Sequence, residues 1–149
     1  DAHEPPVIII DMGTATTITV IGPNSRLLGG AILPGAAVSL EALSGAASLL
    51  PRISLDAPKR AIGSGTVECM KSGAVFGAAC AIDGMIERME AELGGSAALV
   101  ATGGLAGRII PYCRHDIEID DYMLLRGLSL IWERNRREKR REARQTPRA

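Results

Sequence analysis

The stretch Ile8-Ile9-Ile10-Asp11-Met12-Gly13-Thr14-Ala15-Thr16-Thr17 carries the strongest structural signal in this chain. Its apolar, β-branched beginning, Val7 to Ile10, predicts a strand that is covered on both faces. Asp11 follows at the strand end, where a carboxylate can hold a cation or orient a reacting group. Gly13 leaves room for a phosphate to approach backbone N–H groups, and Thr14 adds a hydroxyl. The stretch therefore predicts a phosphate loop, although the same residue types also form plain turns.

The residues that follow predict a three-stranded antiparallel meander and a helix. Ile18 to Ile21 resumes the β-branched pattern, Gly22 to Ser25 is a turn, and Arg26 to Leu33 is a third strand that Gly29-Gly30 interrupts. Pro34-Gly35 then opens a helix over residues 36–48. This helix is expected to place three apolar residues on one face, namely Leu40, Leu43 and Ala47.

The second half of the chain predicts alternating helices and strands. Thr66 is a plausible N-cap, Gly73 a break, and Ala74 to Leu93 an amphipathic helix with apolar residues at three- and four-residue intervals. A strand over 97–101 leads through Gly103-Gly104 into a short helix over 105–110, whose N-terminus would offer N–H groups to a nucleotide. Such a glycine turn can also serve packing alone. A last strand over 117–119 and a helix after Asp120-Asp121 complete an RNase H-like α/β order.

Composition is that of one packed domain with a basic end. The 149 residues are 46% hydrophobic with only four aromatics, so Ala, Val, Ile and Leu must fill the core. Acidic and basic residues number 17 each, but eight basic and three acidic residues lie from Glu133 onward. Helical spacing, interspersed acids and the absence of an aromatic platform favour a solvated helix end. We therefore expect no nucleic-acid binding.

Cysteine usage and hydropathy favour a reducing cytoplasm. The three cysteines show no metal-ligand spacing, and Cys69 and Cys80 are expected to be small core residues. No signal peptide and no charge-free apolar stretch of about 18 residues is visible, so no membrane span is predicted.

Five segments, in this order along the chain, resemble motifs of type III pantothenate kinases, the Bvg accessory factor-like family. They are Asp11 to Thr17, Gly29 to Gly35, Ser39 to Leu43 with Leu50 to Ile53, Ile62 to Thr66 with Met70 to Gly73, and Ala101 to Ala106. The resemblance implies an RNase H-like domain of the actin-like kinase superfamily over 1–134, and a basic helical or disordered tail over 135–149. It also implies ATP-dependent phosphorylation of pantothenate to 4′-phosphopantothenate, the first step of coenzyme A biosynthesis.

The resemblance also assigns roles to residues. Asp11 would coordinate the monovalent cation, potassium or ammonium. Gly13 and Thr14 would contact the ATP phosphates, and Gly103 and Gly104 would border the adenosine. Thr66 would contact pantothenate, and magnesium would accompany the nucleotide. Two departures affect the substrate side: Ser64-Gly65 stands where the family usually has lysine and asparagine, and Phe76 replaces a common tyrosine.

Two family motifs do not occur in this sequence: the Asp-x-Gly-Asn-Thr phosphate loop and the Gly-x-Asp-Arg motif that holds the general base. No catalytic residue is therefore assigned here. The chain matches the carboxy-terminal half of the family, and we expect it to be inactive without an amino-terminal half. Apolar faces left open by that separation predict a homodimer. The alternative is a truncated, non-catalytic homologue that dimerises or binds nucleotide, with a regulatory role.

Overall fold

The computed structural model describes residues 3–145, with side chains described as far as Arg140. In chain order its elements are β1 (Val7–Met12), β2 (Ala15–Ile21), β3 (Leu27–Pro34), α1 (Ala36–Ala46), α2 (Thr66–Leu93), β4 (Ala98–Thr102), α3 (Ala106–Ile109), the 3-10 turn η1 (Ile110–Tyr112), β5 (Glu118–Ile119) and α4 (Met123–Gln145).

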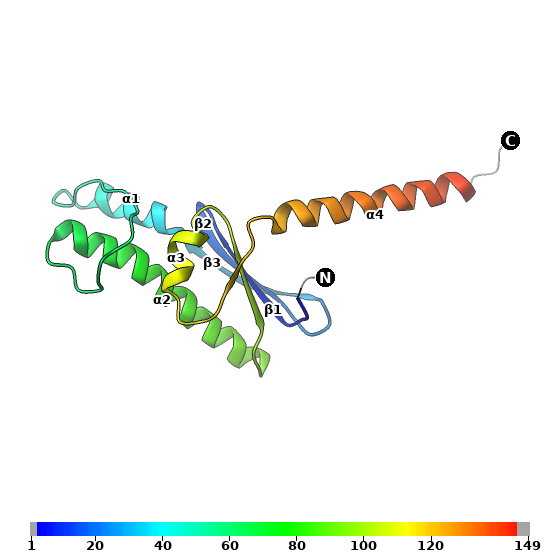
Figure 1. Ribbon diagram of the computed structural model, residues 1–149, viewed down its shortest axis with the longest axis horizontal. Coiled ribbons are helices and arrows are strands. Elements are labelled where there is room, and N and C mark those ends of the chain that lie inside the picture. Colours follow the sequence, from blue (N-terminus) through cyan, green and yellow to red (C-terminus); the bar gives the residue numbers. More distant parts are fainter. Residues whose placement is uncertain (1–2, 146–149) are drawn as a thin grey trace.

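The strands form a single five-stranded sheet in the order β3-β2-β1-β4-β5 (Figure 1). The first three strands are antiparallel neighbours, whereas β4 pairs parallel to β1 and β5 pairs parallel to β4. This arrangement confirms the predicted meander and the RNase H-like α/β fold. The third strand continues through Gly29-Gly30, but its pairing with β2 shifts register next to Gly29, which has φ +138°. A Cβ at Gly30 would lie 1.8 Å from the carbonyl oxygen of Ile18, so glycine is what lets β3 approach β2 there.

One face of the sheet holds the core. Alternate residues of β1 and β2, including Ile8, Ile10 and Ile18, are buried against α2 through Ile82 and Ile86. Within residues 3–145, α2 is the one helix long and apolar enough to cross a membrane. Its packing on the sheet accounts for that composition.

The break predicted at Gly73 is wrong, because α2 runs unbroken from Thr66 to Leu93. Its N-cap is Gly65, so the N-cap prediction for Thr66 is wrong as well. At the other end, Gly94 has φ +75° and its N–H donates to carbonyl oxygens of the last turn. The predicted stop at Gly94-Gly95 is confirmed.

Three smaller expectations also need correction. Helix α1 ends at Ala46 and buries Leu40, but Leu43 is half exposed and Ala47 lies beyond the helix. Cys69 and Cys80 are exposed rather than core residues, because the neighbouring positions Met70 and Ala79 of α2 are the ones buried in the core. Only Cys113 is partly buried, next to the backbone of Ala79.

The other face of the sheet stays largely open, and α4 projects away from the body (Figure 1). This helix begins after Asp120, whose carboxylate accepts a hydrogen bond from the Tyr122 N–H at 3.0 Å and pairs with Arg126. The predicted start of the last helix at Asp120-Asp121 is confirmed.

Candidate functional site

The polar residues singled out from the sequence meet where β1 and β4 end. Asp11 lies on β1 in register with Thr17 on β2 and Thr102 on β4. Residues opposite one another in adjacent strands share a face of the sheet, so these three oxygen-bearing side chains form a row. Asp11 is exposed, and no ion pair to it occurs among the described residues. Its carboxylate is therefore open to a cation from solution.

The turn between β1 and β2 is tight, and the residue that precedes α1 stabilises it. The Gly13 N–H donates to the Ala15 carbonyl at 3.0 Å, and the Gly35 N–H donates to the Thr14 carbonyl at 3.1 Å. A Cβ at Gly35 would lie 2.4 Å from that Thr14 oxygen, so the start of α1 packs directly against the turn. The Thr14 side chain itself is exposed. The turn is thus held in place while its hydroxyl faces solvent.

The glycine turn after β4 packs on the end of β1. Gly103 has φ +96°, and a Cβ there would lie 2.7 Å from Asp11 Oδ1 and from the Met12 backbone. Gly104, by contrast, faces open space. The structure therefore brings Asp11, Gly13, Gly103 and Gly104 to one end of the sheet, together with Thr14.

The short helix after this turn does not present a free N-terminus, which corrects one expectation. Helix α3 has only four residues. The Leu105 N–H donates to the Met12 carbonyl at 3.1 Å, and the Ala106 N–H donates to the Gly103 carbonyl at 3.0 Å. Because these N–H groups already bind within the chain, the contribution of this segment to a site comes from the glycine turn.

Thr66 lies apart from this group. It is exposed in the first turn of α2, and Figure 1 shows that end of α2 extending past the sheet beside α1. The loop before it is ordered by Glu68, whose carboxylate accepts hydrogen bonds from the Ser64 hydroxyl at 2.6 Å and the Ser64 N–H at 2.9 Å. These hydrogen bonds lower the pKa of Glu68. Ser64, a departure from the family pattern, thus holds the start of the helix.

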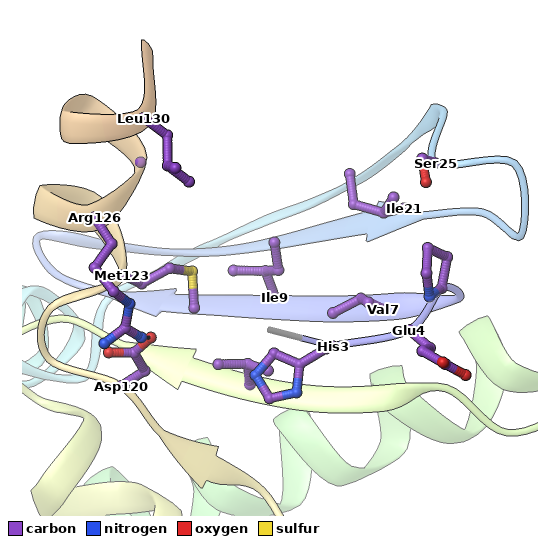
Figure 2. A pocket seen from close by; sticks show the side chains of 13 residues that line it. His3, Glu4, Val7, Ile9, Ile21, Ser25, Asp120, Met123, Arg126 and Leu130 are labelled. Carbon is purple, nitrogen blue, oxygen red and sulfur yellow. Dashed lines mark hydrogen bonds and ion pairs between the residues drawn. The ribbon is translucent and has the colours of Figure 1, made fainter. Parts of the chain in front are cut away.

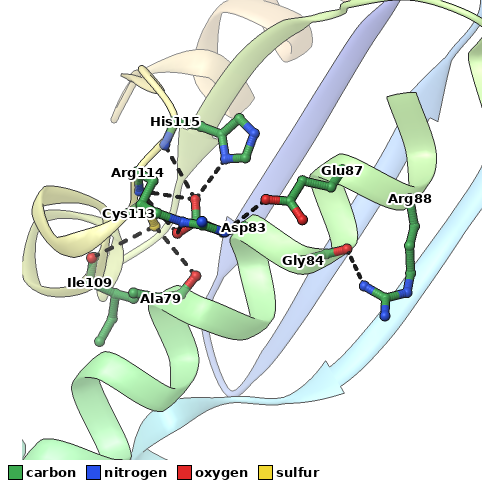
Figure 3. Close-up of polar contacts among 9 residues, drawn as sticks. All are labelled: Ala79, Asp83, Gly84, Glu87, Arg88, Ile109, Cys113, Arg114 and His115. Atoms are coloured by element: carbon green, nitrogen blue, oxygen red, sulfur yellow. Dashed lines mark hydrogen bonds and ion pairs between the residues drawn. The ribbon is translucent and has the colours of Figure 1, made fainter. Parts of the chain in front are cut away.

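A second polar cluster, shown in Figure 3, was not found from the sequence. Asp83 is buried on α2 and accepts the Arg114 N–H at 3.0 Å with both carboxylate oxygens. It also accepts the His115 N–H at 3.3 Å and contacts His115 Nδ1 at 2.7 Å. Burial raises the pKa of Asp83, but the bonds from His115 and the two backbone N–H groups outweigh it, so the pKa is lowered. The cluster fastens the η1–β5 connection to α2.

The neighbouring Cys113 does not offer a reactive thiol. Burial raises the pKa of the Cys113 thiol to about 12, so it stays protonated at neutral pH. Within the described part of the chain, no three His, Cys, Asp or Glu side chains converge as a metal site. Asp11 would hold a cation as a single carboxylate, with hydroxyl, backbone or ligand oxygens completing its shell.

The fold is that of an actin-like, RNase H-like α/β domain. The chain resembles a solved structure described as a Baf family transcriptional activator from Campylobacter jejuni, with a TM-score of 0.64 and 28% identity, covering 89% of this chain and 59% of that one. A family model described as type III pantothenate kinase matches residues 1–88. The chain belongs to the type III pantothenate kinase family.

Curated relatives agree with this assignment. The type III pantothenate kinase of Moorella thermoacetica is 45% identical over 130 residues, which are 87% of this chain and 51% of that protein. That of Myxococcus xanthus is 41% identical over 135 residues, 91% of this chain and 53% of that protein. The chain thus spans about half the length of the curated relatives it matches.

Proposed function

We propose that this chain forms the carboxy-terminal half of a kinase that transfers a phosphoryl group from ATP to pantothenate, giving 4′-phosphopantothenate for coenzyme A biosynthesis. The observation that carries the proposal is the single polar end of the sheet. There the Gly13-Thr14 turn and the Gly103 turn, which are about ninety residues apart in sequence, close on Asp11. The choice of pantothenate as the substrate rests on the relatives named type III pantothenate kinase.

The residues at this end fit a nucleotide and a monovalent cation. The exposed Asp11 carboxylate, beside the hydroxyls of Thr17 and Thr102, offers the hard oxygen donors that potassium or ammonium prefers. The Thr14 hydroxyl is free to donate to a phosphate oxygen, and Gly13 keeps side-chain atoms out of its way. Gly103 and Gly104 would border the adenosine, and the open space at Gly104 leaves room for it. Bound ATP with magnesium supplies the phosphoryl group and neutralises its charge.

Pantothenate would be bound at a distance from this loop, through Thr66. Thr66 is exposed and is not used as a helix cap, so its hydroxyl is available. The Ser64–Glu68 contact holds the loop beside it. We propose that a second protein half helps to bring the substrate hydroxyl to the phosphate.

That second half is also where the general base and the other phosphate loop would reside. The proposed domain is residues 1–134, with 135–149 as a basic extension. This division places the boundary inside α4, which continues to Gln145. We propose that the chain alone does not turn over pantothenate, and that nucleotide binding through Thr14 and the glycine turn can persist.

The cation role of Asp11 is tested in a reconstituted enzyme, made by mixing this chain with a separately expressed amino-terminal half of the Moorella thermoacetica relative. Asp11→Asn should lower the rate by roughly tenfold or more, about 1.4 kcal/mol of transition-state stabilisation, and should weaken the potassium dependence together with it. Asp121→Asn, at another exposed aspartate, is the matched control. An Asp11→Asn enzyme with wild-type rate and an unchanged potassium titration would show that Asp11 is a turn residue only.

A further inference from the structure

The connection between α1 and α2 is fastened to the rest of the chain by side chains from two helices. Residues 47–65, all of which the structure describes, form neither helix nor strand. Connections of this length without secondary structure of their own are uncommon in compact domains and usually serve a function. The 47–65 connection leads directly into Thr66, the proposed pantothenate contact. Its position therefore influences where Thr66 lies.

Helix α2 holds the later part of this connection through polar side chains of its second turn. Lys71 Nζ lies 2.7 Å from Asp56 Oδ2, and the buried Ser72 hydroxyl donates to the Ala61 carbonyl at 2.6 Å. The hydrogen bond from Lys71, followed by that from Ser54, lowers the pKa of Asp56. These contacts fix the connection to the same helix that it leads into.

One contact comes from α3 instead and joins distant parts of the sequence. Arg108 Nη1 donates to the Leu55 carbonyl at 2.9 Å. The Leu55 side chain is buried in the core, which holds its carbonyl in place. The charge of Arg108 adds, after Lys71 and Ser54, to the lowering of the pKa of Asp56, so the guanidinium also attracts that carboxylate. Because a guanidinium carries five N–H donors in a fixed fork, one arginine can hold a loop in a defined orientation.

Helix α3 is itself fixed to the Gly103-Gly104 turn. Two backbone N–H groups at the start of α3 bind the carbonyl oxygens of Met12 and Gly103. The Ile109 side chain, next to Arg108, is fully buried, so the helix cannot shift independently of the core. Arg108 therefore moves together with the glycine turn that is proposed to border the adenosine.

The open face of the sheet does not connect these two parts of the chain. The groove on that face, about 930 Å³ in volume, is lined by residues that include Ile9 of β1 and Met123 of α4 (Figure 2). Neither the glycine turn nor the 47–65 connection lines it. Among the described residues, the Arg108–Leu55 contact is the one hydrogen bond between α3 and the 47–65 connection.

We propose that Arg108 is a positioning residue that couples the nucleotide side of the site to its pantothenate side. The inference rests on the proposed function, in which the glycine turn borders adenosine and Thr66 contacts pantothenate. A nucleotide packed against the glycine turn restrains α3, and Arg108 passes that restraint through the Leu55 carbonyl to the connection that ends at Thr66. Coupling between two sites is reciprocal, so pantothenate strengthens nucleotide binding by the same factor.

A purely structural role for Arg108 would have a different consequence. Loss of a structural tether lowers the free energy of unfolding but leaves the effect of one ligand on the other unchanged. Arg88 provides the matched control, because its Nη1 donates to the Gly84 carbonyl at 2.8 Å within α2. Arg88→Gln should keep the coupling of the wild type, whereas Arg108→Gln should remove it. Arg108→Lys, which keeps the charge and a donor, should retain part of it.

Limited proteolysis of the chain gives the first test. Trypsin can cut the connection after the exposed Arg52 and Arg60. Magnesium with β,γ-imido-ATP, a non-hydrolysable analogue, is added at a concentration that saturates the chain in calorimetry. Cleavage at these two sites, followed by mass spectrometry, should slow about threefold or more in wild type and in Arg88→Gln, and should not slow in Arg108→Gln. Equal protection of Arg108→Gln overturns the proposal, as does wild-type cleavage that the bound analogue leaves unchanged.

Calorimetry measures the coupling itself in the enzyme reconstituted with the amino-terminal half of the Moorella thermoacetica relative. The analogue should raise the affinity for pantothenate about fivefold or more in wild type and less than about twofold in Arg108→Gln. The affinity for pantothenate alone should be similar in both. A wild-type enzyme that binds the two ligands independently overturns this inference alone, even if the variant fails to fold. A reconstituted enzyme that does not bind the analogue overturns the proposed function and this inference with it.

Discussion

Gly103 is the residue on which the geometry of the polar sheet end most depends. Its φ of +96° is unfavourable for any other residue, and a Cβ would lie 2.7 Å from Asp11 Oδ1. We predict that Gly103→Ala lowers the free energy of unfolding by about 1–3 kcal/mol, the usual cost of such backbone strain. Urea denaturation of the chain measures it.

The neighbouring glycine provides the control. A Cβ at Gly104 would meet nothing within 4 Å, so Gly104→Ala should change the free energy of unfolding by no more than about 0.5 kcal/mol. Equal effects of the two alanines would mean that the packing of Gly103 on Asp11 and Met12 is not a constraint.

Asp83 should govern how the stability of the chain responds to acid. Its pKa is lowered in the folded state, so the unfolded chain binds the proton more readily. The stabilisation is therefore complete above the unfolded pKa of about 3.9 and is lost as the pH falls through the lower folded value. Asp83→Asn should lose about 1.5–3 kcal/mol at pH 7, as expected for hydrogen bonds to a charged group.

The pH dependence of stability distinguishes the loss of the Asp83 charge from a simple packing defect in Asp83→Asn. The difference in unfolding free energy between wild type and Asp83→Asn should shrink from pH 6 to pH 3, as followed by urea denaturation. Glu87→Gln removes the exposed carboxylate that also pairs with Arg114, and should cost less than about 1 kcal/mol. A constant difference across the pH range would show that the charge of Asp83 does not stabilise the fold.

Asp11 and Asp83 differ in how far the sequence alone could identify them as members of a polar cluster. Asp11, Gly13 and Thr14 are adjacent in the chain, so their motif predicts a loop without knowledge of the fold. Asp83 and His115 are 32 residues apart and belong to no motif. Only the packing of the η1–β5 connection on α2 brings them together, so sequence reasoning missed them.

Helix α2 is the element for which local propensity was misleading. Glycine is a poor helix former, and Gly73 was therefore expected to break the helix. The buried side chains of Met70, Ser72 and Val75 on either side of it hold the backbone helical. Tertiary packing thus outweighs the unfavourable helix propensity of glycine, which is about 1 kcal/mol. The periodicity of the adjoining residues alone does not show that the packing is strong enough to do so.

The same glycine offers a stabilising substitution. Gly73 is exposed and a Cβ there would meet nothing within 4 Å, so Gly73→Ala should raise the free energy of unfolding by about 0.5–1 kcal/mol. Thermal and urea unfolding of the chain would show the gain. Gly30→Ala, whose Cβ would meet the Ile18 carbonyl, should be destabilising instead. A loss of stability in Gly73→Ala would mean that α2 is not regular at this position.

For the molecule as a whole, the order of strands and helices was predictable because hydrophobic periodicity and turn residues mark each element. The parallel pairing of β4 with β1, which places Gly103 on Asp11, follows from that order in an RNase H-like sheet. The direction of α4 was not predictable. Its apolar and basic residues predict an amphipathic helix. They do not predict which surface the helix packs against when one face of the sheet is open.

We propose that this chain supplies one half of a kinase site and that the proton acceptor lies in the other half. Positioned acid–base groups contribute roughly 10²–10⁴-fold and the orientation of two reactants still more, so the chain without them should show no measurable turnover. The most direct measurement is phosphopantothenate formation from ATP, magnesium, potassium and pantothenate, with and without a relative's amino-terminal half. We expect no product from the chain alone, and product from the mixture, which Thr14→Ala should abolish. Robust turnover by the chain alone, lost in Thr14→Ala, would contradict it and place the base within this chain.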